Sequence, residues 1–190
     1  MSAANLPYLM TVAEFLDWPT PDGSDRWELV DGVPIAMAPA SDRHGIIHAQ
    51  AVYLLAGHLA DSRPDCRVIV EPGTKPDDHN LRIPDLTVTC GPIPPPGDPA
   101  ARFSNPVLVV EILSPSNWRK TMRNVASYAA IEGVAEVLVL HSARMLAQVF
   151  RSGTSGAWDD ITVATAGAEF VELTSIGFPA PLGAFYRTVT

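Results

Sequence analysis

Two acidic residues occupy apolar segments that are typical of β-strands. Asp85 begins the alternating run of "IPDLTVTC", and Glu111 interrupts the apolar run "PVLVVEIL" at residues 106–113. Because side chains alternate across a strand, the two acids could project side by side if these strands are neighbours. Such a pair repels unless a cation lies between the carboxylates, and Mg²⁺ prefers hard oxygen ligands of this kind. The spacing therefore indicates a candidate magnesium site.

The same two acids also fit a structural role. An Asp that follows Pro at the start of a strand is often a turn or cap residue. A Glu at the end of a strand can pair with a nearby Arg. Two acids without further motifs are more often structural than catalytic, because structural ion pairs also bring carboxylates together.

The elements that would position these acids alternate between strand and helix patterns. Upstream we expect a short helix in "TVAEFLDWP", capped by Thr11 and Glu14, and then a hairpin that turns at Asp31-Gly32. An amphipathic helix over 42–60 follows. Two strands come next, "CRVIVEPG" and "LRIPDLTVTC", separated by a polar turn, "TKPDDHN". Downstream we expect a Pro-rich loop over 91–106, the Glu111 strand, a helix over 118–132, and strands in "AEVLVLHS" and "MLAQVFRS". The fold class is therefore α/β (α+β), with a mixed central sheet flanked by helices.

Length, charge and cysteine content limit the classes of protein that this chain can belong to. The 190 residues suit a single domain, 1–190, and the net charge of −8 argues against a protein that grips nucleic acid by charge alone, although a local basic patch or a metal could override that average. The sequence shows neither a bilayer-length apolar run nor a signal-peptide pattern, so we expect a cytoplasmic protein and no membrane partner. Cys66 and Cys90 lack metal-type spacing and fit two reduced thiols better than a disulfide scaffold, with one bridge left open.

Several short motifs occur in a specific order: "YLMTVAEFLDWP", "RWELVDGVPIAMAPAS", "IPDLTV", "LVVEILSPSN" and "GVAEVLVL". This order resembles the Uma-type "putative restriction endonuclease" family of the PD-(D/E)XK nuclease superfamily, strongly over residues 8–150 and more weakly beyond. The resemblance implies a restriction-endonuclease-like core that cleaves DNA with Mg²⁺, or with Mn²⁺ in its place. It leaves a homodimer open.

The resemblance also implies roles for individual residues. Asp85 and Glu111 match the acids that hold the metal. Glu28 and Glu71 match recurrent acids and are further candidate ligands. His44 matches a recurrent polar position and is a candidate to bind phosphate or to move protons.

One expected residue is missing. The superfamily places a Lys two residues after the Glu, where this chain has Leu113, and family members commonly move it to a position that here is Asn124. Asn carries no positive charge and cannot activate a water as a lysine would. Lys120 lies one helical turn before Asn124 and is our candidate replacement. Lys75 and Arg82 lie near the Asp85 strand and are further candidates, although a Lys or Arg at any of these three positions is more often a solvated surface residue.

Other features carry weaker signals. His44 and His48 have an i, i+4 spacing that can bind zinc, but a polar helix face is the simpler interpretation. Ser114 and Ser116 have no nucleophile-elbow context, and Ser116 or Asn117 is expected to cap the following helix. Three functions therefore remain open: a metal-dependent DNA endonuclease, a degenerate nuclease fold that binds nucleic acid or protein, or an enzyme that acts on another phosphodiester, such as RNA or a nucleotide.

Overall fold

The computed structural model describes residues 8–24, 26–98, 103, 105–115, 117–153 and 158–189. Its centre is a six-stranded sheet in the order β10-β9-β8-β7-β6-β3. Strands β7 (Leu108–Leu113) and β8 (Glu136–His141) run parallel, and the other neighbours in this sheet run antiparallel. The remaining strands are β3 (Cys66–Val70), β6 (Leu86–Cys90), β9 (Ala147–Ser152) and β10 (Trp158–Ala164). The mixed central sheet that the sequence predicted is confirmed.

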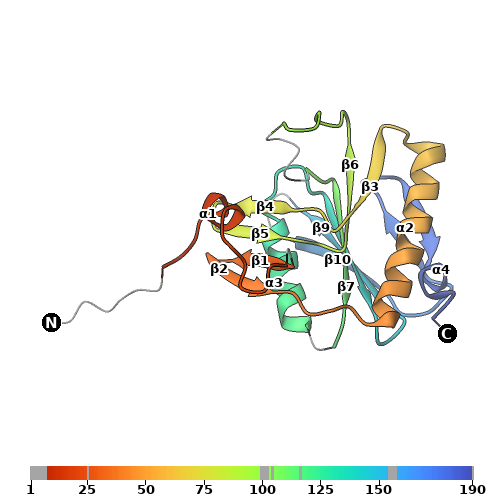
Figure 1. Cartoon of the computed structure of the whole chain (residues 1–190). Helices are drawn as coiled ribbons and strands as arrows, with labels where there is room; N and C mark the ends of the chain where they lie inside the picture. The colour runs from red at the N-terminus through yellow and green to blue at the C-terminus, as the bar shows by residue number, and fades with distance from the viewer. Residues whose placement is uncertain are drawn as a thin grey trace.

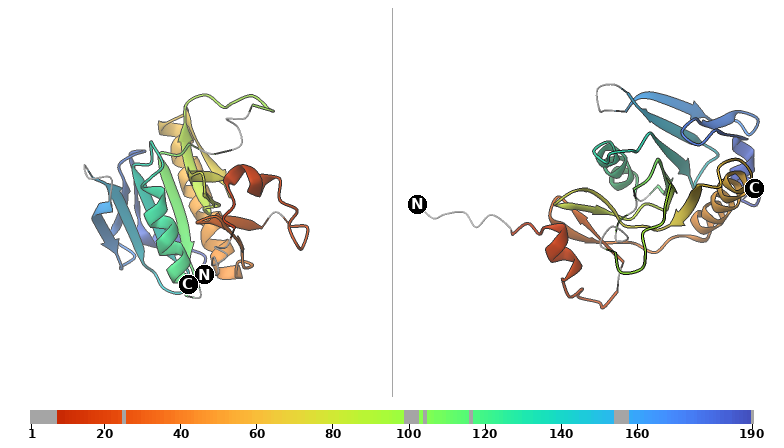
Figure 2. Two further views of the ribbon diagram at one scale, coloured as in Figure 1. Left: turned by 90° about the vertical axis from the view of Figure 1, so that its left-hand side faces the viewer. Right: turned by 90° about the horizontal axis from the view of Figure 1, so that it is seen from above.

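Two helices cover opposite faces of this sheet (Figure 2). Helix α2 (Asp42–Ser62) packs on the face that carries Val110, and α3 (Trp118–Tyr128) packs on the face that carries Val109. The hairpin of β11 (Phe170–Leu173) and β12 (Phe178–Pro181) and helix α4 (Leu182–Tyr186) lie on the α2 side (Figure 1). None of the described helices combines the length and the apolarity that crossing a bilayer requires.

A smaller sheet, in the order β2-β1-β5-β4, lies with α1 (Val12–Leu16) on the side away from α2 and α4 (Figure 1). Its strands are β1 (Trp27–Val30), β2 (Val33–Ala36), β4 (Thr74–Asp77) and β5 (Asn80–Arg82). The predicted hairpin turn is confirmed, since Asp31 and Gly32 both have positive φ, 50° and 77°. The capping box of Thr11 and Glu14 is also present.

Three local predictions need correction. The strand predicted in "LRIPDLTVTC" is interrupted, because β5 ends at Arg82 and β6 begins at Leu86, so Asp85 lies between two strands. "TKPDDHN" is not wholly a turn, because Thr74–Asp77 forms β4, which pairs with β5 despite its polar composition. The helix predicted over 118–132 ends earlier, at Tyr128. The chain then turns, and Gly133 takes a φ of 93° that suits glycine, before β8 begins.

The segment between β5 and β6 joins the two sheets. Only Ile83, Pro84 and Asp85 separate the end of β5 from the start of β6. Asp85 therefore lies where the chain passes from the small sheet into the large one. Ile83 and Asp85 both line the cavity described below.

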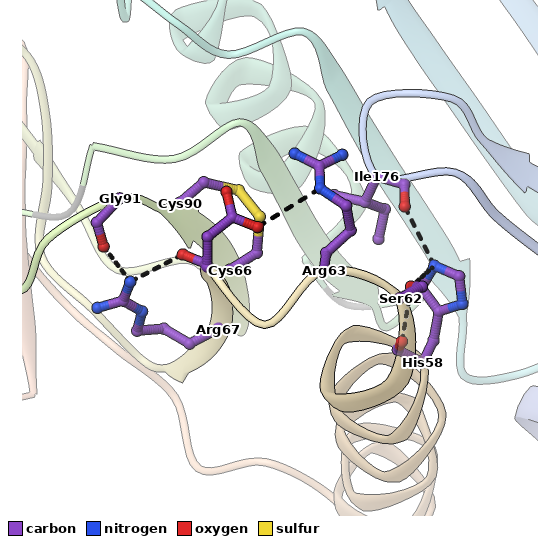
Figure 3. Close-up of a disulfide and its surroundings, with 9 residues drawn as sticks. His58, Ser62, Arg63, Cys66, Arg67, Cys90, Gly91 and Ile176 are labelled. Atoms are coloured by element: carbon purple, nitrogen blue, oxygen red, sulfur yellow. Dashed lines mark hydrogen bonds and ion pairs between the residues drawn. A yellow bond between two sulfur atoms is a disulfide. The ribbon is translucent and has the colours of Figure 1, made fainter.

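A disulfide joins Cys66 and Cys90, so the expectation of two reduced thiols is wrong (Figure 3). Cys66 begins β3 and Cys90 ends β6, and the antiparallel register pairs them directly, with their Cα atoms 3.9 Å apart. Sequence spacing alone does not reveal this pairing, because 24 residues separate the two cysteines along the chain. Arg67 donates to the carbonyl oxygen of Asp65 at 2.9 Å beside the bridge.

Candidate active site

Asp85 immediately precedes β6, and Glu111 belongs to the neighbouring strand β7. Leu86 of β6 pairs with Val110 of β7, and one further step in this antiparallel register sets Asp85 opposite Glu111. Both residues line one cavity of about 260 Å³. The pairing of β6 with β7 therefore brings the two carboxyl groups to one cavity.

Hydrogen bonds hold Asp85 on both of its oxygens. Oδ1 lies 2.8 Å from Nε2 of His44, and Oδ2 accepts from the backbone N–H of Ile112 at 2.6 Å. His48, one turn further along α2, places Nε2 3.1 Å from the backbone carbonyl oxygen of Asp85. The i, i+4 histidine spacing thus serves to hold Asp85 from one side of the cavity, a role that the sequence analysis missed.

The pKa of His44 is raised above its usual value. Burial is the largest influence and by itself lowers this pKa, but the hydrogen bond and the charge of Asp85 outweigh it, and the charge of Glu71 adds to the rise. The side chain of His44 is 13% exposed. The imidazole therefore holds a proton more firmly than a free histidine does, next to the acid pair.

Glu111 is buried and contacts α3. Tyr128 donates its hydroxyl to Oε1 of Glu111 at 2.6 Å, and Asn124 also forms a side-chain hydrogen bond to this carboxyl group. Burial raises the pKa of Glu111 well above its usual range, and the charge of Asp85 raises it further. The two hydrogen bonds act in the opposite direction, because they stabilise the carboxylate. The sequence analysis gave no role to Tyr128, although it lies four residues after Asn124 on the same helix face.

Glu28 and Lys120 form an ion pair beside this acid pair. Glu28 is almost fully buried on β1, and its Oε1 accepts from the backbone N–H of Ile83 at 3.0 Å. Its Oε2 lies 2.6 Å from Nζ of Lys120. Both residues line the cavity, so α3 brings a cation into it from a different position than the superfamily pattern predicts.

Leu113 and Asn124, at the two positions where a lysine was expected, make other contacts. Leu113 packs with Val125 in the apolar cluster beneath α3. Asn124 is buried and binds Glu111, as described above. The other two candidates to replace the lysine, Lys75 and Arg82, do not line the cavity. Lys75 pairs with Asp78 at 2.5 Å, and Arg82 donates to the carbonyl oxygen of Leu29 at 2.5 Å.

Glu71 and the loop before α3 complete the site. Glu71 adopts a φ of 46°, rare for a residue other than glycine, and donates its backbone N–H to the carbonyl oxygen of Asp85 at 3.0 Å. Its side chain is exposed at the cavity. Asn117 occupies the N-cap position of α3, but its Oδ1 accepts from the N–H of Ser114 at 2.8 Å and caps no helical N–H group. The alternative cap, Ser116, lies outside the described residues.

The donor set fits a hard divalent cation. Asp85 and Glu111 offer carboxylate oxygens, each of which can accept more than one contact. A cation between them would offset the repulsion that raises the pKa of Glu111. In the described part of the chain, three His, Cys, Asp or Glu ligand atoms come within 4.8 Å of one another only at Asp65, Cys66 and Cys90. The sulfurs of that group are already bonded to each other, and the acid pair brings two carboxyl groups together, so a cation held there would take its remaining ligands from water or phosphate oxygens.

Comparison with known proteins identifies the family. Residues 12–180 match the profile of the Uma2 family, described as "Putative restriction endonuclease". The chain belongs to the Uma2 family. A search of curated proteins gives no match.

A solved structure supports the same fold. The chain resembles the crystal structure of a "putative nuclease belonging to DUF820" from Anabaena variabilis with a TM-score of 0.73. The two sequences are 18% identical, and the alignment covers 94% of this chain and 98% of the other. At this identity the likeness concerns the fold. Together, the Uma2 family and the fold support a nuclease, with nucleic acid as the class of substrate.

Proposed function

We propose that this Uma2 protein is a metal-dependent endonuclease that hydrolyses phosphodiester bonds in DNA, with the whole chain, 1–190, acting as one nuclease-like domain. The observation that carries the proposal is the cavity in which Asp85 and Glu111 lie opposite each other and Lys120 supplies a cation. Restriction-endonuclease-like proteins generally use a divalent metal, and the oxygen donors here favour Mg²⁺, with Mn²⁺ as a substitute.

The carboxyl groups of Asp85 and Glu111 would hold this cation, and Glu71 or Glu28 could add a further oxygen. A bound divalent ion lowers the pKa of a coordinated water and offsets negative charge on the phosphate. Glu28 is the less available of the two additional acids, because its oxygens already face the N–H of Ile83 and the ammonium of Lys120. Glu71 is exposed at the cavity, so its carboxylate is the more accessible of the two.

The basic residues would act on the phosphate and on proton transfer. Lys120 would donate to a phosphate oxygen while keeping its ion pair with Glu28, since its ammonium has three donors and its side chain is 28% exposed. His44 would keep Asp85 oriented through the 2.8 Å contact and would donate its proton where negative charge develops. Both roles place a positive charge where a phosphodiester has to bind in an acidic protein.

DNA cleavage tests the proposal. Plasmid and linear DNA are incubated with the wild type and with Asp85→Asn, in Mg²⁺, in Mn²⁺ and in EDTA. We expect cleavage by the wild type with either metal, none in EDTA, and a loss of at least about 100-fold in the variant. Asp61→Asn, an exposed acid of α2 outside the cavity, is the matched control and should cleave normally. Equal activity of wild type and Asp85→Asn would refute the assignment.

A non-catalytic role in binding nucleic acid or protein is the second candidate. It is favoured by Leu113 and Asn124 at the two lysine positions, and by the engagement of the Lys120 ammonium with Glu28. Calorimetric titration with Mn²⁺ separates the two functions. A nuclease site should bind Mn²⁺ and lose that binding in Asp85→Asn, whereas a degenerate site should show no binding that depends on Asp85.

A further inference from the structure

A second cavity, of about 270 Å³, lies beside the acid cavity. Its lining comes from the ends of β7 and β8, from the start of α3 and from the turn into β9: Leu113, Pro115, Trp118, His141, Ala143 and Arg144. Neither the family nor the mechanism proposed above assigns it a role.

One short loop separates the two cavities. Ser114 and Asn117 line the acid cavity, whereas Pro115 and Trp118 line the second one. The second cavity also lies at the carboxyl ends of the parallel strands β7 and β8, which α3 connects. Ligands of open α/β sheets bind at this edge, because the loops there diverge and leave a crevice. A molecule held in the second cavity would therefore extend naturally toward Asp85 and Glu111.

The side chains of the second cavity suit a flat aromatic ligand. Trp118 lines the cavity and is 53% exposed to solvent as a whole residue, although a large aromatic ring is usually covered. Arg144 supplies a guanidinium on the same cavity, and guanidinium groups stack on aromatic faces as well as binding phosphate. His141 is buried, with Nε2 3.1 Å from Oε1 of Gln148. The cavity thus combines an aromatic face, a cation and a polar ring edge.

The charge around this cavity contrasts with that of the whole chain. The net charge is −8, with only 13 Lys and Arg residues in the sequence. Of these cations, Arg144 lines the second cavity, and Arg119 and Arg123 lie on the first two turns of α3, the helix that begins at Trp118. Arg119, Arg123 and Arg144 are exposed. Cations gathered beside an exposed tryptophan complement a ligand that carries both phosphates and stacking bases.

We propose that the second cavity binds an unpaired nucleobase of the nucleic-acid substrate, which stacks on Trp118 while Arg144 and the exposed arginines of α3 bind the neighbouring phosphates. The proposal rests on the proposed nuclease function only for the direction of the strand, which leads from the second cavity to Asp85. A base paired inside a duplex cannot present its face to Trp118, so binding through this cavity requires a single strand, a frayed end or an extruded base.

Binding measured without cleavage tests this proposal. Fluorescein-labelled single-stranded DNA of mixed sequence is titrated with the whole protein in EDTA, and anisotropy gives the Kd. Trp118→Ala should weaken binding about 5- to 100-fold, the range for the loss of one stacked base, and Trp118→Phe should restore most of the affinity. Arg144→Ala should weaken binding and reduce its dependence on salt. A duplex with blunt ends should bind more weakly than the single strand and respond less to Trp118→Ala.

Controls come from the same chain. Phe170→Ala removes an aromatic residue that is 56% exposed on β11, and Arg187→Ala removes an exposed cation near the carboxyl end, so both should leave the Kd unchanged. A strand of abasic sugar-phosphate should bind the wild type and Trp118→Ala equally. An RNA strand of the same sequence shows whether the base or the sugar decides binding.

The outcomes separate this proposal from the nuclease function. Equal affinity of wild type, Trp118→Ala and Trp118→Phe for single strands overturns the base site, even if the protein cleaves DNA. Binding that depends on Trp118 in a protein that never cleaves supports the base site and refutes the nuclease. Protein that binds no nucleic acid refutes both. Because Trp118 is exposed, its replacement should leave the unfolding midpoint in urea unchanged. If Trp118→Ala shifts that midpoint, the comparison rests on Trp118→Phe and Arg144→Ala.

Discussion

Tyr128 fixes the more deeply buried of the two central acids, and Tyr128→Phe removes only the hydroxyl that does so. The lost contact is the 2.6 Å hydrogen bond to Oε1 of Glu111, in an environment where Tyr128 is fully covered. A hydrogen bond between neutral groups contributes about 1 kcal/mol to stability, and one to a charged group about 1.5–3 kcal/mol. The loss therefore depends on whether Glu111 carries a charge.

The pH dependence follows from the pKa of Glu111, which burial and Asp85 raise well above its usual range. At low pH, Glu111 is protonated and Tyr128→Phe should cost about 1 kcal/mol. As pH rises through the raised pKa, the acceptor becomes charged and the cost should approach about 3 kcal/mol. The hydroxyl favours the carboxylate, so the variant should also raise the pKa of Glu111 further.

Urea unfolding in EDTA measures these free energies at two pH values, pH 5 and the highest pH at which the wild type stays folded. Tyr186→Phe is the matched control, because its buried hydroxyl donates to the backbone carbonyl of His141 at 2.8 Å and not to an acid. It should cost about 1 kcal/mol at both pH values. Adding Glu111→Gln completes a double-mutant cycle, in which the pH-dependent part of the Tyr128 effect should vanish.

The same variants address ligand geometry. Loss of a partner that orients a metal ligand typically weakens metal binding by about 10- to 100-fold, so Tyr128→Phe should lower Mn²⁺ affinity by that factor, and Tyr186→Phe should not. If Tyr128→Phe cost the same free energy at both pH values and left Mn²⁺ affinity intact, the assigned role of Tyr128 at Glu111 would be refuted.

Three further predictions concern the residues around the acid pair. The pKa of His44 is raised in the folded state, so the stability that its protonation contributes is fully present below pH 6.5 and declines as pH rises through the folded pKa. His44→Gln should therefore lower the free energy of unfolding in urea more at pH 6 than at pH 9. A loss that grew toward pH 9 would contradict this. Lys120→Met leaves the buried carboxylate of Glu28 without its cation and should lower the free energy of unfolding by about 3 kcal/mol. Adding Glu28→Gln should recover most of this loss. A double variant as unstable as the single one would argue against the ion pair. Replacing both Cys66 and Cys90 by Ala should lower the free energy of unfolding by about 2–4 kcal/mol under oxidising conditions, and the wild type in a reductant should match the variant.

Sequence patterns predicted the acid pair because the relevant information is local and periodic. The alternation in "PVLVVEIL" assigns Glu111 to one face of β7, and the pairing of β6 with β7 brings Asp85, the residue before β6, opposite it. The hairpin at Asp31-Gly32 was predictable for a similar reason, since that dipeptide specifies its own turn.

Contacts between distant segments were not predictable in this way. The pairing of Cys66 with Cys90 depends on the register between β3 and β6, which neither strand specifies alone. The contact between Nε2 of His48 and the carbonyl oxygen of Asp85 depends on the rotation of α2 about its axis. β4 was missed because its pairing partner, and not its own polar composition, makes Thr74–Asp77 a strand. Such features require the packed molecule, because they arise from tertiary contacts and not from local propensity.

The three-residue link between β5 and β6 has a consequence for folding. Glu28 belongs to the small sheet and Glu111 to the large one, and the N–H of Ile83, in the link itself, binds Glu28. Neither sheet alone contains the full set of acids, and α3 must also dock before Lys120 and Tyr128 reach them. Contacts between segments so far apart in the chain form late, because loop closure has to be completed first. The acid cluster is therefore a property of the finished fold, and a partly synthesised or partly unfolded chain lacks it.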